Sequence, residues 1–119
     1  MEMKMGINGT GDLSKVDSVI RGAAKAEAEG FDSYWVAQIF GIDSLTALAI
    51  AGREVPRIEL GTAVVPTYPR HPMMLASQAL TVQQVVGDRL ALGIGLSHQI
   101  VVESMWGYSY AKPVRHMRE

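Results

Sequence analysis

The most constraining feature of this sequence is the stretch from Ile58 to His71. Its apolar run from Leu60 to Val65 is typical of a β-strand covered on both faces, as strands are in a parallel sheet. Pro66 lacks an amide donor and predicts the end of that strand, while Pro72 suits the first turn of a following helix. Because ligands of parallel α/β proteins bind at the loops that follow the strands, this loop is a candidate wall of a functional site.

Strand patterns alternate with helix patterns along the chain. Short apolar or aromatic-rich segments predict strands at residues 3–8, 31–38, 60–65 and 90–96. Amphipathic segments predict helices that begin near residue 14, at residue 43 or 44, and at residues 72, 99 and 113. Ser14 and Asp17 resemble a capping box for the first helix, which follows a glycine-rich loop at residues 8–11.

This alternation predicts an α/β fold with a parallel sheet and right-handed crossovers. The chain has 119 residues and no linker, so a single domain over residues 1–119 is expected. A complete (β/α)₈ barrel needs about 250 residues, so four β/α units correspond to roughly half of one. A doubly wound domain of four or five strands fits the same length.

Composition excludes several function classes. A net charge of −1 gives no long-range attraction to nucleic acid or to an anionic membrane, and no apolar run reaches transmembrane length. The chain has no cysteine, which excludes disulfides and thiolate chemistry and fits a cytoplasmic protein. The three histidines lack ligand-like spacing with carboxylates, so no metal site is expected. Trp106 and Tyr108 are expected in the core or at an interface.

Three segments resemble the luciferase-like monooxygenase superfamily: residues 31–38, residues 60–66 with Arg70-His71-Pro72, and residues 92–98. Within it they resemble most the branch of oxidoreductases that uses coenzyme F420, a deazaflavin. Residues 112–119 resemble the family's lead-in to its next helix. The resemblance implies that the chain forms the N-terminal (β/α)₄ half of a luciferase-like TIM barrel.

In that family the deazaflavin lies across the C-terminal mouth of the barrel, against the ends of the strands. Gln38 stands where many relatives have a histidine; its amide can hydrogen-bond to a ring but cannot exchange protons at neutral pH. Ala63 and Val64 match the place where the family often has a non-prolyl cis peptide against the cofactor ring. The resemblance therefore implies that all three residues bind the cofactor.

The end of the fourth strand supplies three more candidates. Gly95 would let a flat ring approach the backbone closely, and Ser97 would donate to the cofactor or cap the next segment. His98 aligns with a position where some relatives carry a carboxylic acid. Because histidine side chains titrate near neutrality, His98 could protonate or polarise a substrate. His98 and Gln38 are the candidate catalytic residues, and both are also expected at the cofactor.

Two classes of function fit these observations. The first is an oxidoreductase that moves a hydride between coenzyme F420 and a small organic substrate, with FMN as the alternative cofactor. The second is a catalytically incompetent half-barrel that acts in assembly or ligand binding. Four strands leave open sheet edges, which favour a homo-oligomer or a complementary C-terminal half as partner.

Overall fold

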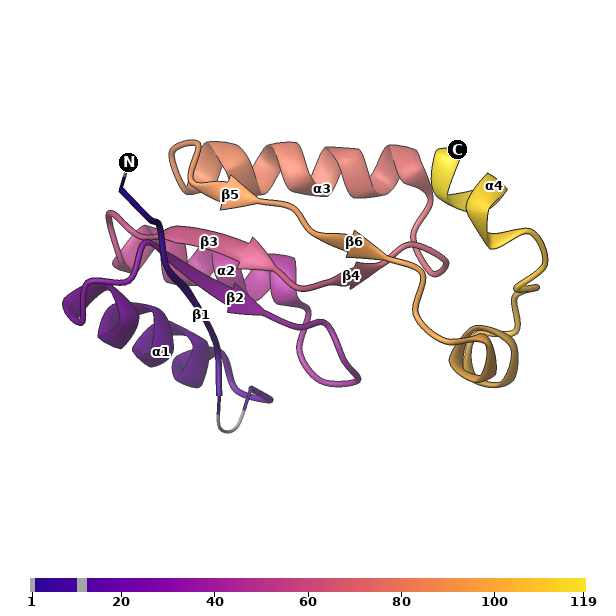
Figure 1. Cartoon of the computed structure of the whole chain (residues 1–119), viewed down its shortest axis with the longest axis horizontal. Helices are drawn as coiled ribbons and strands as arrows, with labels where there is room; N and C mark the ends of the chain where they lie inside the picture. Colours follow the sequence, from indigo (N-terminus) through magenta and orange to yellow (C-terminus); the bar gives the residue numbers. More distant parts are fainter. Residues whose placement is uncertain (1, 11–12) are drawn as a thin grey trace.

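A computed structural model describes residues 2–10 and 13–119 of the chain (Figure 1). Gly11, in the predicted glycine-rich loop, lies outside the described residues. Strands alternate with helices, in the order β1 (Gly6–Asn8), α1 (Val16–Ala28), β2 (Ser33–Val36), α2 (Ser44–Glu54), β3 (Glu59–Thr62), β4 (Val65–Pro66), α3 (Pro72–Val85), β5 (Leu90–Ala91), β6 (Ile94–Gly95), a π-helical turn η1 (Val101–Met105) and α4 (Pro113–Arg118).

All paired strands are parallel, as the sequence predicts. Strands β1, β2, β3 and β5 form one sheet in that order, and β4 pairs with β6 in a second, two-stranded sheet. Figure 1 shows β4 and β6 continuing in the direction of β3 and β5. The α/β prediction is therefore confirmed, and the strands end toward a common side of the molecule.

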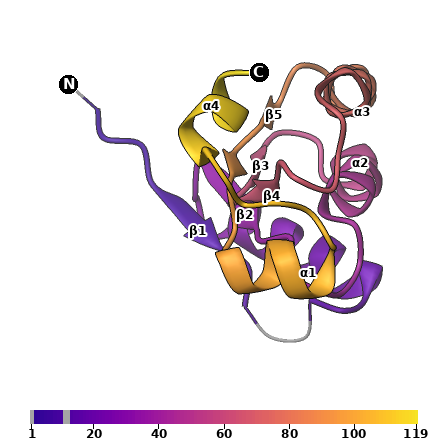
Figure 2. The same ribbon diagram turned by 90° about the vertical axis from the view of Figure 1, so that its right-hand side faces the viewer.

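Helices α1, α2 and α3 lie on one side of the strands. Figure 2 shows α1, α2 and α3 as an arc along one face, and neighbouring helices pack against each other. In a doubly wound domain helices would cover both faces, so the arrangement is that of a barrel wall. The side chains buried between strands and helices are mainly branched aliphatic ones, including Val19, Val36, Leu45, Leu48, Leu60 and Val86.

Two predicted strands are interrupted at the same level, which corrects their expected extents of 60–65 and 90–96. One breaks between β3 and β4, where the Ala63–Val64 peptide is cis, and its neighbour breaks between β5 and β6. The Thr62 hydroxyl bridges the break: it donates to the Gly93 carbonyl at 2.8 Å and accepts from the Gly93 amide at 2.9 Å. A Cβ at residue 93 would collide with the Thr62 carbonyl oxygen, so the close approach requires glycine.

Helix starts agree with the sequence at four places, Ser44, Pro72, Gln99 and Pro113, and differ at one. Asp43 caps α2, its Oδ2 accepting from the Thr46 amide at 2.9 Å, and Pro72 is the first residue of α3. The prediction of a capping box that begins at Ser14 is wrong, since α1 begins at Val16 with Lys15 as its N-cap. The Lys15 carbonyl accepts from the Ser18 amide, and the first turn is thus displaced by one residue.

The bridge at the strand break predicts the effect of removing one hydroxyl. We expect Thr62→Val to lower the free energy of unfolding by about 1–3 kcal/mol, because the fully buried site would leave the Gly93 amide without its partner. Thr62→Ser keeps the hydroxyl and should cost clearly less. Urea unfolding of the two variants tests this, and equal destabilisation would contradict the role of the hydroxyl.

Candidate functional site

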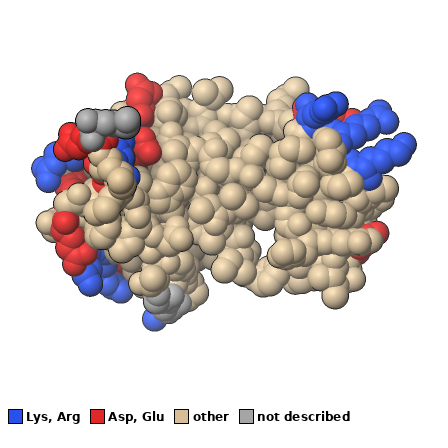
Figure 3. Space-filling model, in the orientation of Figure 1, with Lys and Arg blue, Asp and Glu red and all other residues tan. Residues whose placement is uncertain are grey.

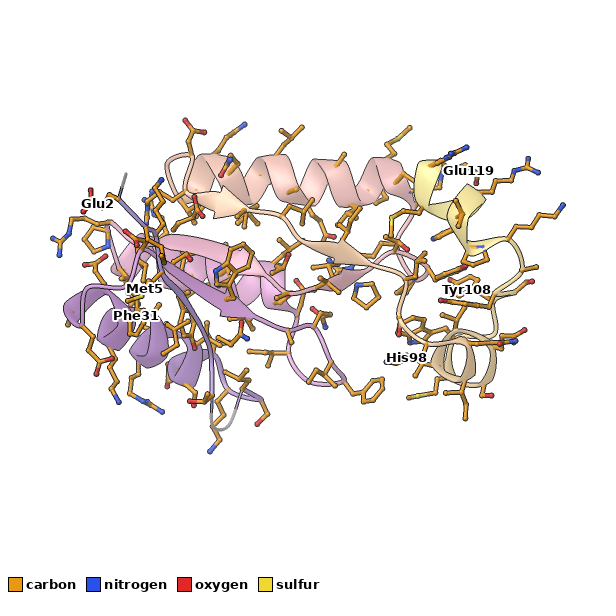
Figure 4. All side chains as sticks on the ribbon, in the orientation of Figure 1. Glu2, Met5, Phe31, His98, Tyr108 and Glu119 are labelled. Atoms are coloured by element: carbon orange, nitrogen blue, oxygen red, sulfur yellow. The ribbon has the colours of Figure 1, made fainter. Side chains whose placement is uncertain are left out.

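A pocket of about 400 Å³ lies where β2, β4 and β6 end. Its walls come from the loop after β2, from the turn between β3 and β4, and from the segment after β6. They are lined by Ala37, Gln38, Ile39, Phe40, Ala63, Val64, Pro66, Ser97, His98, Val101 and Trp106. Figure 4 shows His98 at the opposite end of the molecule from Met5 and Phe31, which precede β1 and β2. Parallel strands thus gather the six predicted site residues at one end, and five of them line the pocket.

The Ala63–Val64 peptide forms the strand-side wall and is cis, as the family resemblance implies. The Ala63 amide donates to the Val36 carbonyl at 2.9 Å, and the Val64 carbonyl accepts from the Gln38 amide at 3.3 Å. Both side chains are exposed, with Val64 40% accessible. The turn is therefore held by its neighbour strand while it presents an apolar surface to the pocket.

Gln38 holds the loop after β2 in place. Its Oε1 accepts from the Ser44 amide at 2.7 Å, and its Nε2 donates to the Ile42 carbonyl at 3.3 Å. These bonds tie the end of β2 to the first turn of α2. They fix the orientation of the amide and leave one lone pair and one N–H for a further partner.

Ser97 and His98 form the wall that follows β6. Ser97 has φ of 64°, and its carbonyl accepts from the Tyr110 hydroxyl at 3.2 Å. Tyr110 also stacks on Tyr68, with ring centroids 5.4 Å apart. The His98 carbonyl accepts from the Val102 amide at 3.0 Å, while its side chain is exposed at the pocket. The backbone is thus fixed and the imidazole is accessible.

Gly95 is the predicted site residue that does not line the pocket. A Cβ at this position would lie 2.6 Å from Cγ2 of Val64. The space that the glycine leaves open is therefore filled by Val64. Gly95 shapes the pocket indirectly, because a larger residue would push Val64 out of place.

An ion pair between Asp43 and Arg70 links the loop after β2, which lines the pocket, to the loop between β4 and α3. Arg70 also donates to Oε1 of Gln78 on α3 at 2.9 Å. Burial alone would raise the pKa of Asp43, but hydrogen bonds from Thr46 and Arg70, and the charge of Arg70, lower that pKa below its ordinary value. Sequence analysis quoted Arg70 within a motif but missed this pair, since its partners lie in separate loops.

Trp106 is a pocket residue that sequence analysis did not assign to the site. It was expected in the core or at an interface, yet it lines the pocket beside Val101. Phe40, which attracted no prediction, lines the pocket and is 64% accessible. An aromatic residue in the loop after a predicted strand was the available signal.

No helix in residues 2–10 and 13–119 has the length and apolar character to cross a bilayer. Within the same ranges, no three histidine, aspartate or glutamate side chains are grouped so that they could hold a metal ion.

Comparison with known families gives a match to luciferase-like monooxygenases over residues 3–119. The chain belongs to the luciferase-like monooxygenase family. Among its luciferase-like relatives, a Mycobacterium tuberculosis protein provisionally named a coenzyme F420-dependent oxidoreductase is 40% identical over 96 residues. The 5,10-methylenetetrahydromethanopterin reductase of Archaeoglobus fulgidus is 34% identical over 98 residues. These matches cover 81% and 79% of the chain, but only 28% of each relative.

Solved luciferase-like structures share the fold. A type II Baeyer–Villiger monooxygenase from Pseudomonas putida, solved with FMN, superposes with a TM-score of 0.83 at 21% identity, over 99% of the chain and 37% of that structure. An F420-dependent secondary alcohol dehydrogenase gives 0.80 at 20% identity, over 97% and 38%. The chain matches the N-terminal part of these barrels, so the predicted luciferase-like half-barrel fold is confirmed. The chain spans less than half the length of each of these solved structures.

The Asp43–Arg70 pair predicts an acid-dependent stability. The pKa of Asp43 in the folded protein lies below the ordinary 3.8. The charged carboxylate therefore stabilises the fold above pH 3.8, and this stabilisation is lost as the pH falls through the folded-state pKa. At pH 7 we expect Asp43→Asn to be less stable by about 0.5–1 kcal/mol, a modest cost because the pair is partly exposed. Thermal unfolding at pH 7 and pH 3 measures the difference, which should shrink at pH 3. Parallel pH profiles would contradict the assignment.

Proposed function

We propose that this chain forms the cofactor-facing wall of an oxidoreductase that transfers a hydride between coenzyme F420 and an organic substrate. The observation that carries the proposal is the single pocket that joins the Ala63–Val64 turn to Gln38, Ser97 and His98. The M. tuberculosis relative named for coenzyme F420, at 40% identity, supports the choice of cofactor. The A. fulgidus relative is named a reductase, which supports the oxidoreductase class.

The residues present fit a flat, mainly apolar ring with polar edges. Ala63 and Val64 offer an exposed apolar surface for the face of the ring. The N–H and the lone pair that remain on the Gln38 amide suit hydrogen bonds with carbonyl and nitrogen atoms of the ring. When bound, the deazaflavin supplies the hydride chemistry, and the protein supplies position and polar contacts. His98, accessible at the pocket, is placed to give or take a proton at the substrate oxygen.

Fluorescence titration of the purified 119-residue chain with coenzyme F420 and with FMN tests this function. We expect F420 to bind at least tenfold more tightly than FMN. Val64→Asp should weaken F420 binding about tenfold or more, because a buried carboxylate against the ring would lack a partner. Val114→Asp, on α4 outside the pocket and 67% accessible at the native valine, is the matched control and should bind normally.

Three results would contradict the proposal. Tighter binding of FMN would favour the FMN-dependent alternative. Unchanged F420 affinity of Val64→Asp would place the cofactor elsewhere. Failure to bind either cofactor, together with a mass above that of a monomer in light scattering, would favour an assembly module in which open sheet edges pair with another copy.

A further inference from the structure

Three aromatic rings from separate segments stack on one another at the end of the molecule where the strands finish. Tyr68 lies in the loop between β4 and α3, Tyr110 lies in the segment before α4, and His116 lies on α4. The rings of Tyr68 and His116 have centroids 3.8 Å apart and planes 9° apart, and Tyr110 stacks on the same Tyr68 ring at 5.4 Å. The stack therefore joins α4 and the segment before it to the loop after β4.

Helix α4 faces the body of the protein with its histidine. Pro113 and His116 are half-buried, whereas the other residues of α4 are exposed. Nε2 of His116 lies 2.9 Å from Oγ1 of Thr67, in a hydrogen bond whose donor depends on the imidazole tautomer. The lysine and arginine side chains at this end project outward in Figure 3, and Arg115 pairs with Glu119, four positions along the chain. The docking of α4 therefore depends on His116 and its ring and hydroxyl partners.

The stack reaches the strand-end pocket through one hydroxyl group. The Tyr110 hydroxyl donates to the Ser97 carbonyl at 3.2 Å, and Ser97 and the next residue, His98, both line the pocket. Ser97 has φ of 64°, in the left-handed region, where a Cβ crowds the backbone. Such a conformation persists only where surrounding contacts hold it. The bond from Tyr110 is one of these contacts, and it acts on the residue whose backbone sets the direction of His98.

The tyrosines in and near the stack differ in how their hydroxyls are used. The Tyr68 hydroxyl is buried and has no hydrogen-bond partner among the described residues, so this tyrosine contributes its ring. The Tyr110 hydroxyl makes the bond to Ser97. Tyr108 lies in the same segment as Tyr110 and is 48% accessible. Removing one hydroxyl at a time therefore separates the effect of the bond from that of the stack.

We infer that Tyr110 is a positioning residue for His98. Its ring is held in the stack with Tyr68 and His116. Its hydroxyl keeps Ser97 in the left-handed conformation, so that the imidazole of His98 stays at the pocket. The docking of α4 thereby sets the position of a group that is placed to move a proton. This inference rests on the proposed function, in which the imidazole must lie within reach of the bound ligand.

The test follows the imidazole of His98 by NMR while coenzyme F420 is added. The chain has three histidines, so the ¹³Cε1–¹H signal of His98 can be assigned with His98→Gln. A deazaflavin ring shifts the signal of a nearby imidazole, and the shift at saturation depends on the separation of the two rings. We expect Tyr110→Phe to reduce this saturating shift about twofold or more and to weaken F420 binding about threefold to tenfold, because Ser97 is released. A loss of stability alone would leave the saturating shift of the folded protein unchanged.

Two variants serve as matched controls and one as a rescue. Tyr68→Phe and Tyr108→Phe each remove a hydroxyl that does not bond to Ser97, and both should match wild type in the saturating shift and in F420 affinity. Ser97→Gly should reduce the effect of Tyr110→Phe, because glycine adopts a positive φ without strain. The effects of these two changes on the saturating shift should therefore be non-additive.

The outcomes separate this inference from the proposed function. Wild-type F420 binding, with an equal saturating shift in Tyr110→Phe, would overturn the positioning role and leave the proposed function standing. An equal loss of shift in Tyr68→Phe would assign the effect to the ring stack and would also overturn the role of the hydroxyl. Additive effects of Ser97→Gly and Tyr110→Phe would overturn the link through Ser97. Absence of F420 binding by the wild-type chain would overturn both the proposed function and the inference.

Discussion

The hydroxyl of Thr62 holds the candidate site together, because it joins two strands where both leave their regular pairing. Its two hydrogen bonds to Gly93 join the strands between the paired stretches β3–β5 and β4–β6. The pairing then resumes in β4 and β6, with the Val65 amide donating to the Gly93 carbonyl at 2.9 Å. The chain between Thr62 and Val65 is left to turn outward, and Val64 reaches the pocket.

The remaining walls are held by contacts between segments far apart in the sequence. Gln38 ties the end of β2 to the start of α2, and Arg70 reaches back to Asp43 across 27 positions. Tyr110 bonds to the Ser97 carbonyl from 13 residues further along. Each wall is therefore positioned by a hydrogen bond or ion pair, while its pocket-facing surface is mainly apolar. That division explains how an open pocket keeps its shape with exposed aromatic side chains.

Much of this architecture could be predicted from the sequence, because buried parallel strands and their helices leave strong apolar patterns. Pro66 predicted where the strand at residues 60–65 ends. The parallel arrangement then predicted that Gln38, Val64 and His98 lie together. The apolar pattern of residues 60–65 does not reveal the strand break, and only the family resemblance pointed to an unusual peptide at Ala63–Val64. The Asp43–Arg70 pair and the position of Trp106 depend on how separate loops pack, which local spacing does not encode.

The most direct test of this site is methyl NMR of the valines while coenzyme F420 is added. Val64 lies on the strand-side wall and Val101 lines the same pocket, whereas Val19 is on α1 and is fully buried in the core. Deazaflavin bound at the strand ends should shift the methyl resonances of Val64 and Val101 strongly and leave those of Val19 in place. Shifts centred on Val19 with Val64 unmoved, or no valine shift at saturating cofactor, would contradict the assignment of this pocket.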